Sequence, residues 1–128
     1  MTLFETIELL RRHFKRSLKR AKYRSKKKGM DFNLSFSDLR NLYFLQKARC
    51  FYTGQQFNFT DKLKRLSLDR VNSDEGYVVG NVVWCLLEIN YIKYKFKYSS
   101  IKNICLKLLT HNPNWKLVDE QLGLQQRT

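Results

Sequence analysis

Apolar residues recur at steps of three and four near the start of the chain, which is the spacing of one face of an amphipathic helix. The pattern predicts a helix over residues 3–21, followed by a basic turn from Arg24 to Gly29. A second helix is expected over residues 38–47, with Ser37 as its N-cap. The apolar stripe of the first helix consists of Leu3, Ile7, Leu10, Phe14, Leu18 and Ala21.

The middle of the chain changes to a period of two. Residues 66–71 alternate apolar and polar side chains, and residues 78–84 form a second extended piece that is broken at Gly80. The polar residues 72–76 have the composition of a loop, so the two pieces predict a hairpin. Residues 50–54 predict a shorter strand that ends in a turn.

Helical spacing returns after the hairpin. It predicts a helix over residues 86–97 and a last helix that begins at Ser99 or Ser100 and is ended by Asn112-Pro113. A final short segment is expected around residues 115–118. The order of elements predicts an α+β fold, with a hairpin-helix core at residues 50–97. A helical arm (1–30) and a C-terminal helix and tail (98–128) flank this core in a single domain of 128 residues.

The charge of the chain adds a functional indication. There are 25 Lys and Arg against 11 Asp and Glu, a net charge of +14, and residues 1–30 hold 11 of the basic side chains. Nucleic acid is the expected partner, with a solvated basic surface and an anionic membrane surface as alternatives. The chain has no apolar stretch long enough to span a bilayer. The helical arm is expected to grip phosphates through Arg11, Arg12, Lys15, Arg16 and Lys19.

Three cysteines, Cys50, Cys85 and Cys105, are far apart and form no Cys-x-x-Cys pair. Neither a disulfide framework nor a four-cysteine zinc site is favoured. The pattern is typical of a reducing, intracellular setting, and the N-terminus has no hydrophobic signal core.

Polar residues in and after the hairpin suggest a metal site. Asp69 ends the first strand, and Asn90 lies on the following helix. A hairpin folded onto that helix would bring the two side chains together, and carboxylate and amide oxygens are suitable ligands for Mg²⁺ or Mn²⁺. Such a site suits phosphodiester hydrolysis. Asn81 carries donors and an acceptor, enough to tie the loop to its own backbone. Taken singly, each residue also has an ordinary structural explanation.

The ordered set Leu66-Ser67-Leu68-Asp69-Arg70, Gly76-Tyr77, Gly80-Asn81-Val82 and Asn90-x-x-Lys93 resembles the HNH (ββα-metal) endonucleases. It is most similar to the phage-type branch, in which an Asp-Arg pair also occurs. The resemblance covers roughly residues 50–97. It implies that Asp69 and Asn90 bind the metal, that Asn81 supports the loop, and that Lys93 lies near the substrate phosphate.

Two departures from the family pattern stand out. Arg70 occupies the place of the usual histidine base and, because it stays protonated, is expected to orient a water or stabilise negative charge. Tyr43, His13 or a metal-bound water would then accept the proton. Only Cys50 is kept of the cysteines that bind zinc in related proteins, so apolar packing is expected there and no zinc.

Lysines and aromatic residues interleave after Asn90, where residues 89–118 contain no acidic side chain. Lys93, Lys95 and Lys97 are expected to contact the DNA backbone, although a solvated lysine-rich face is an alternative. The sequence thus predicts a magnesium- or manganese-dependent endonuclease for double-stranded DNA, intracellular and phage-type. A homodimer is one way to cut both strands. The alternatives are a non-catalytic DNA-binding protein on the same fold and a nuclease for structured RNA or DNA junctions.

Overall fold

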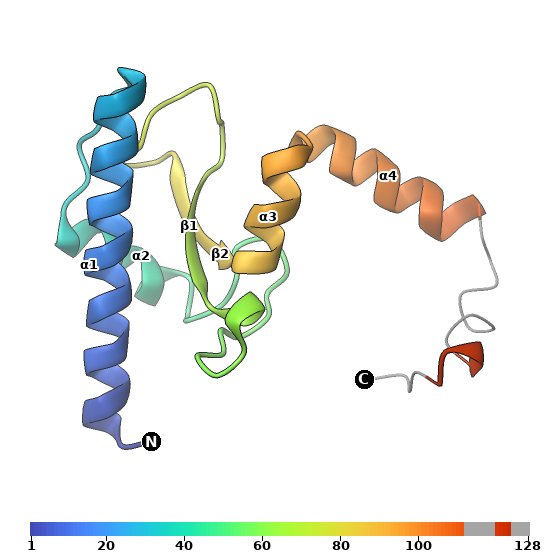
Figure 1. Ribbon diagram of the computed structural model, residues 1–128, viewed down its shortest axis with the longest axis horizontal. Coiled ribbons are helices and arrows are strands. Elements are labelled where there is room, and N and C mark those ends of the chain that lie inside the picture. The colour runs from blue at the N-terminus through green and yellow to red at the C-terminus, as the bar shows by residue number, and fades with distance from the viewer. Residues whose placement is uncertain (112–119, 124–128) are drawn as a thin grey trace. The chain divides into compact units, whose positions relative to one another are not determined.

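The computed structural model describes residues 1–111 and 120–123 (Figure 1). The chain forms two compact units, one over residues 1–90 and one that begins at Tyr91, so helix α3 starts in the first unit and ends in the second. The fold of the described residues is α+β, as predicted. Its elements are α1 (Leu3–Lys28), α2 (Phe36–Leu45), the 3₁₀ helix η1 (Lys62–Lys64), β1 (Leu66–Arg70), β2 (Val82–Leu86), α3 (Leu87–Lys95) and α4 (Tyr98–His111).

Helix α1 is longer than the sequence pattern predicted. Thr2 caps its start, with its hydroxyl accepting from the backbone N–H of Glu5 while the Glu5 carboxylate accepts from the Thr2 N–H. The expected basic turn is helical up to Lys28, because lysine and arginine favour helices. Gly29 then ends the helix in the left-handed conformation, at φ 64°.

Helix α2 begins two residues earlier than expected, and its N-cap is Ser35 rather than Ser37. The Ser35 hydroxyl accepts from the Asp38 N–H at 3.2 Å, and the Asp38 carboxylate accepts from the Ser35 N–H at 2.8 Å. Three residues after Ser37 the chain has Arg40, which cannot return such a hydrogen bond. The reciprocal cap therefore decides where the helix starts.

The two strands form the predicted antiparallel hairpin, with Leu66 opposite Leu86 and Arg70 opposite Val82. The second strand is shorter than expected at its start, because residues 78–81 form a turn in which the Asn81 N–H donates to the Val78 carbonyl oxygen at 3.0 Å and Gly80 has φ 92°. The strand expected at residues 50–54 is a turn instead. An isolated bridge between Arg49 and Gln56 flanks this turn.

The main core lies between α1, α2 and the hairpin. Trp84 of β2 is fully buried, and its indole N–H donates to the carbonyl oxygen of Leu39 at 2.9 Å. The Phe14 ring of α1 lies 5.4 Å from the Trp84 ring, centroid to centroid. The Gln46 side chain makes two hydrogen bonds of 2.8 Å with the Trp84 backbone, one as donor and one as acceptor. These contacts fix β2, and with it the hairpin, against the helices.

The loop between the strands is packed against the segment that precedes α2. Phe32 and Tyr77 form a parallel bridge, and the Asn33 side chain accepts from the Val79 N–H at 2.8 Å. Gly76 is buried at this contact, where a Cβ would lie 2.1 Å from the carbonyl oxygen of Asp31. A glycine is therefore needed for the close approach of the two backbones.

We expect Gly76→Ala to lower the free energy of unfolding by about 1–3 kcal/mol, because the added methyl group meets backbone atoms that cannot move independently. Urea denaturation followed by tryptophan fluorescence measures the change. Ser73→Ala, at an exposed position of the same loop, is the control and should leave the stability within about 0.5 kcal/mol of the original. An unchanged midpoint for Gly76→Ala would show that the two segments separate easily.

The second unit consists of the end of α3 and helix α4. Its apolar residues are largely exposed, among them Ile104, Leu106, Leu108 and Leu109. Helix α4 begins at Tyr98, one or two residues before the predicted start at Ser99 or Ser100, and continues to His111. The predicted stop at Asn112-Pro113 and the segment at 115–118 lie outside the described residues. Within residues 1–111 and 120–123, none of the helices has the length and apolar character needed to cross a membrane.

Candidate active site

Asp69 lies near the end of β1 and is buried, with 7% of its surface exposed. The hydroxyl group of Tyr52 donates a hydrogen bond of 2.5 Å to its Oδ2 atom. Side chains two residues apart on a strand share a face, so Asp69 lies on the same face as Ser67. That face is the one on which α3 begins, as the contacts of Asn90 show.

Asn90 lies on α3, directly over this face of the strand. Its Nδ2 atom donates to the Ser67 hydroxyl at 2.6 Å and to the Leu68 carbonyl oxygen at 3.3 Å. The second bond fixes the orientation of the amide, since a carbonyl oxygen accepts only from the NH₂ end. The Oδ1 atom therefore points away from the strand backbone. The fold thus brings Asn90 to Ser67 and Leu68 of β1, the strand that also carries Asp69. The meeting of the Asp69 and Asn90 side chains stays a prediction.

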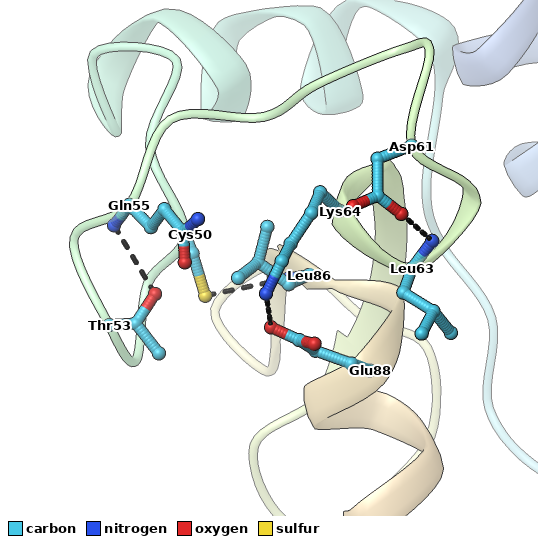
Figure 2. A network of polar contacts seen from close by, with 8 residues as sticks. All are labelled: Cys50, Thr53, Gln55, Asp61, Leu63, Lys64, Leu86 and Glu88. Atoms are coloured by element: carbon cyan, nitrogen blue, oxygen red, sulfur yellow. Dashed lines mark hydrogen bonds and ion pairs between the residues drawn. The ribbon is translucent and has the colours of Figure 1, made fainter. Parts of the chain in front are cut away.

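The start of α3 is held in place by contacts with the loop before β1 (Figure 2). The Cys50 sulfur accepts from the Leu86 N–H at 3.4 Å, and the ammonium group of Lys64 is paired with the Glu88 carboxylate. Cys50 and Leu86 are buried in a small apolar cluster that also contacts Ile89. The apolar packing expected at the positions of the missing zinc ligands is found at Leu86 and Ile89, beside Cys50, whereas Thr53 is exposed. This packing fixes the first turn of α3, which carries Asn90.

Asn81 ties the loop between the strands to its own backbone. It is buried, and its Nδ2 donates to the carbonyl oxygens of Asn72 at 3.0 Å and Gly76 at 2.9 Å. Its Oδ1 accepts from the Asn72 N–H at 2.9 Å. These are the loop contacts that the sequence predicted for Asn81. They shape the segment that directly follows the Asp69 strand.

Arg70 contacts the loop between the strands and the side chain of Met30. Its Nη1 donates to the carbonyl oxygens of Ser73 at 2.9 Å and Glu75 at 3.1 Å, and the guanidinium lies 5.0 Å from the centre of the Tyr77 ring. Adjacent side chains alternate between the faces of a strand, which separates Arg70 from Asp69. This geometry makes Arg70 a brace of the loop. Its expected action on substrate charge stays a prediction.

Tyr52 is a site residue that sequence reasoning missed. It belongs to the turn that had been predicted to be a strand, and no periodic pattern marks it. The only signal in the sequence is its place two residues after Cys50, at the start of the region that the resemblance covers. The structure gives it a direct contact with the candidate metal ligand Asp69.

The two side chains proposed as proton acceptors lie in aromatic surroundings. Tyr43 packs against Phe14 in the core, and burial raises its pKa, so the phenol stays protonated at neutral pH and has no deprotonated form ready to accept a proton. His13 packs against Phe59, with the ring centroids 5.3 Å apart. Its pKa is lowered from 6.5, first by burial and then by the charges of Arg16 and Arg65. A neutral His13 is therefore the favoured form in the folded protein.

The lowered pKa of His13 predicts that acid destabilises the fold. The unfolded chain takes up a proton near pH 6.5 and the folded chain only at a lower pH, so stability should fall as the pH drops below about 6.5. Thermal unfolding between about pH 7 and 5 measures this loss, which should shrink in His13→Gln. His111→Gln, at the other histidine of the sequence, is the control and should keep the original pH dependence. Equal slopes for both variants would contradict the assignment.

The basic residues of α1 lie on different sides of the helix. All five that were predicted to bind phosphate are exposed: Arg11, Arg12, Lys15, Arg16 and Lys19. Arg11, Lys15 and Lys19 line a groove on the α2 side, whereas Arg16 is close enough to His13 to affect its pKa. In the second unit Lys93 is half-buried and Lys97 is exposed. The side chain of Lys95 lies outside what the structure describes.

The comparisons with known proteins find viral relatives. A 72-residue region, 56% of the chain, is 35% identical to an uncharacterized 29.0 kDa protein of Enterobacteria phage T4 from the dda-modA intergenic region. A 101-residue region, 77% of the chain, is 32% identical to an uncharacterized protein of Acanthamoeba polyphaga mimivirus. The matched regions span 28% and 18% of these longer relatives. No family model and no solved structure matches the chain.

Proposed function

We propose that the chain is a metal-dependent endonuclease of the HNH type that hydrolyses phosphodiester bonds in DNA. The observation that carries this proposal is the contact of Asn90 with Ser67 and Leu68 of β1, the strand that also carries the buried Asp69. A strand–loop–strand–helix unit with one carboxylate and one amide at this position is what the family resemblance implies.

The donor set suits a small divalent cation. A carboxylate has lone pairs beyond the one that accepts from Tyr52, and the Asn90 amide is turned with its oxygen away from the strand. Among the described residues, no cluster of three or more His, Cys, Asp or Glu side chains forms an alternative metal site. Two oxygen ligands are typical for Mg²⁺ or Mn²⁺, which keep water and substrate phosphate in their remaining positions. When bound, such an ion polarises the phosphate and stabilises the leaving 3′ oxygen.

The protein's own groups orient these ligands. Tyr52 donates to one carboxylate oxygen of Asp69, which fixes the direction of the other. Ser67 and Leu68 orient the Asn90 amide in the same way. Arg70 and Asn81 hold the loop that continues β1, and both act as positioning residues in this scheme. Lys93, Lys97 and Arg16 are proposed to contact the phosphate backbone of the substrate.

A plasmid assay tests the proposal. Supercoiled DNA is incubated with the purified chain in Mg²⁺, in Mn²⁺ or with a chelator, and nicked or linear product is expected only with metal. A gel shift without cleavage in either metal would favour the non-catalytic DNA-binding alternative. Faster cleavage of a four-way junction or a folded RNA than of duplex DNA would favour the third interpretation. The viral origin of the relatives supports a role inside an infected cell.

We expect Tyr52→Phe to lower the cleavage rate by about 10–100-fold, the usual effect of removing a hydrogen bond to a metal ligand. The variant should also need a higher Mg²⁺ concentration for half-maximal activity, a shift that a purely structural defect would not produce. Tyr91→Phe, at an exposed position on α3, is the matched control. An unchanged Mg²⁺ dependence for Tyr52→Phe would remove Tyr52 from the site.

A further inference from the structure

A groove of about 830 Å³ runs along α1 beside helix α2, and residues of both helices line it. It lies entirely in the first unit and includes none of Asp69, Asn81 and Asn90. Its rim does include Arg11, Lys15 and Lys19, which the sequence pattern predicted to bind phosphate. Its apolar lining residues are Ile7, Leu10, Phe14, Leu18, Phe36 and Phe44. Several remain open to solvent, with Ile7 52% and Phe44 66% exposed. An apolar concave surface of this size is typical of a binding site.

The rim of the groove is strongly basic. Arg40 of α2 contributes from one side, and the α1 side carries Arg11, Lys15, Lys19 and Lys22. Among the described residues, no acidic side chain lines the groove. The rim residues of α1 recur at steps of three and four, so they form a row parallel to the apolar floor.

The groove lies away from the hairpin. His13 and Arg24 mark the side of α1 that faces the rest of the unit, through their contacts with Phe59 and Tyr77. At about 100° per residue, the buried stripe of α1 lies between these two residues and the basic row of the rim. The rim row is therefore on the other flank of the stripe from His13 and Arg24. A molecule bound in the groove would therefore leave the Asp69 face accessible.

We propose that this groove docks an acidic amphipathic helix of a partner protein. The stretch from Ile7 to Lys22 is roughly 22 Å long at about 1.5 Å per residue, which matches about four turns of a bound helix. The apolar face of such a helix would cover the exposed floor, and its acidic flanks would meet the rim lysines and arginines. This inference is independent of the nuclease proposal.

Other occupants match the groove less well. A second copy of this chain, with its net charge of +14, would bring like charges together. Duplex DNA presents phosphates, which suit the rim but would leave the apolar floor of Ile7, Phe36 and Phe44 uncovered. A flat anionic membrane would reach the rim of a concave surface more easily than its floor. The combination of an apolar floor and a basic rim is what favours the acidic helix.

A peptide selection on the full chain tests the proposal. The library holds helical peptides of about 16 residues with a fixed apolar stripe and either Glu or Lys at each flanking position. Selection should enrich Glu at the flanks, and the best peptide should bind at least about tenfold more tightly than its scrambled form in fluorescence anisotropy. Failure to enrich any peptide, or enrichment of Lys, overturns the proposal.

Variants locate the peptide. Lys15→Glu with Lys19→Glu should weaken binding at least about tenfold, whereas Lys102→Glu with Lys107→Glu, the same charge change on α4, should change it less than about twofold. Phe44→Ser keeps the charge and should weaken binding about fivefold or more, which charge attraction alone would not produce. Thermal unfolding checks that the exposed Phe44 is not needed for folding. Insensitivity to Phe44→Ser, or equal sensitivity to both lysine pairs, overturns docking in the groove.

Competition identifies the occupant. A duplex DNA oligomer and vesicles with anionic lipid are added to the labelled peptide complex at moderate salt. Phe44→Ser should leave the affinity of both competitors unchanged, because neither fits the apolar floor. If duplex DNA or vesicles bind with a dependence on Phe44, the groove belongs to that ligand and the proposal is wrong.

Discussion

Asp69→Asn is expected to lower the rate of metal-dependent DNA cleavage by more than about 100-fold. This loss is larger than that expected for Tyr52→Phe, because Asp69 is itself a proposed metal ligand and Tyr52 only orients it. The substitution removes the negative charge and keeps the shape of the side chain. An amide oxygen can still accept the Tyr52 hydroxyl, so the hydrogen bond of 2.5 Å has a counterpart in the variant. The plasmid assay in Mg²⁺ and Mn²⁺ measures the loss, and thermal unfolding should show a much smaller change.

Asp74→Asn is the matched control for this substitution. Asp74 lies in the exposed loop between the strands, only five positions along the chain, and loses the same charge. Its cleavage rate should stay within about twofold of the original, since exposed charges away from the site contribute little. Full activity of Asp69→Asn would remove Asp69 from metal binding and with it the basis of the proposed mechanism.

The central part of the site could be predicted because it is local in the sequence. Period-two alternation identified β1, and the polar loop identified the reversal into β2. Asn90 follows β2 by four residues, and β2 is paired with β1, so a helix that folds back places Asn90 against β1, where it contacts Ser67. No contact between distant segments was needed to foresee this arrangement.

Tyr52 could not be found in this way because its position depends on distant contacts. The turn that carries it is fixed by a hydrogen bond of 3.0 Å from the Phe51 N–H to the carbonyl oxygen of Trp84. It is also fixed by the bridge between Arg49 and Gln56. Neither contact leaves a periodic signal in the sequence.

The orientation of Arg70 is predictable from the sequence, since strand alternation alone places Arg70 on the face opposite Asp69. The family resemblance, by contrast, implies a chemical role at this position. The contacts with Ser73, Glu75 and Tyr77 give the side chain a structural task that the alternation allows.

The groove on α1 shows that the hydrophobic pattern of a helix does not predict how much of its apolar face is buried. The stripe that includes Ile7, Phe14 and Ala21 predicts one buried face. Phe14 and Ala21 are indeed buried, but Ile7 is exposed, because α2 is shorter than α1 and covers only part of the stripe. A helical pattern therefore reports that a face is apolar, and the length of its neighbours decides how much of it is covered.

The second large effect is expected from Asn81, which holds the loop that follows β1. We expect Asn81→Asp to lower the free energy of unfolding by at least about 2 kcal/mol and to reduce cleavage with it. The new carboxylate would face the carbonyl oxygens of Asn72 and Gly76, which now accept from the Asn81 amide. Both carbonyl groups lose their donor, and Asn81 is too buried for water to replace it fully. Urea denaturation and the plasmid assay measure the two losses.

Asn72→Asp is the same chemical change at an exposed position of the same loop. The Asn72 side chain uses its oxygen to accept from the Asp74 N–H at 3.0 Å, a role that a carboxylate fills equally well. This control should stay within about 0.5 kcal/mol of the original stability and keep its activity. Equal losses in both variants would attribute the effect to added negative charge near the site. A loss confined to Asn81→Asp attributes it to the two donor bonds that hold the loop, and so to the shape that β1 and Asp69 require.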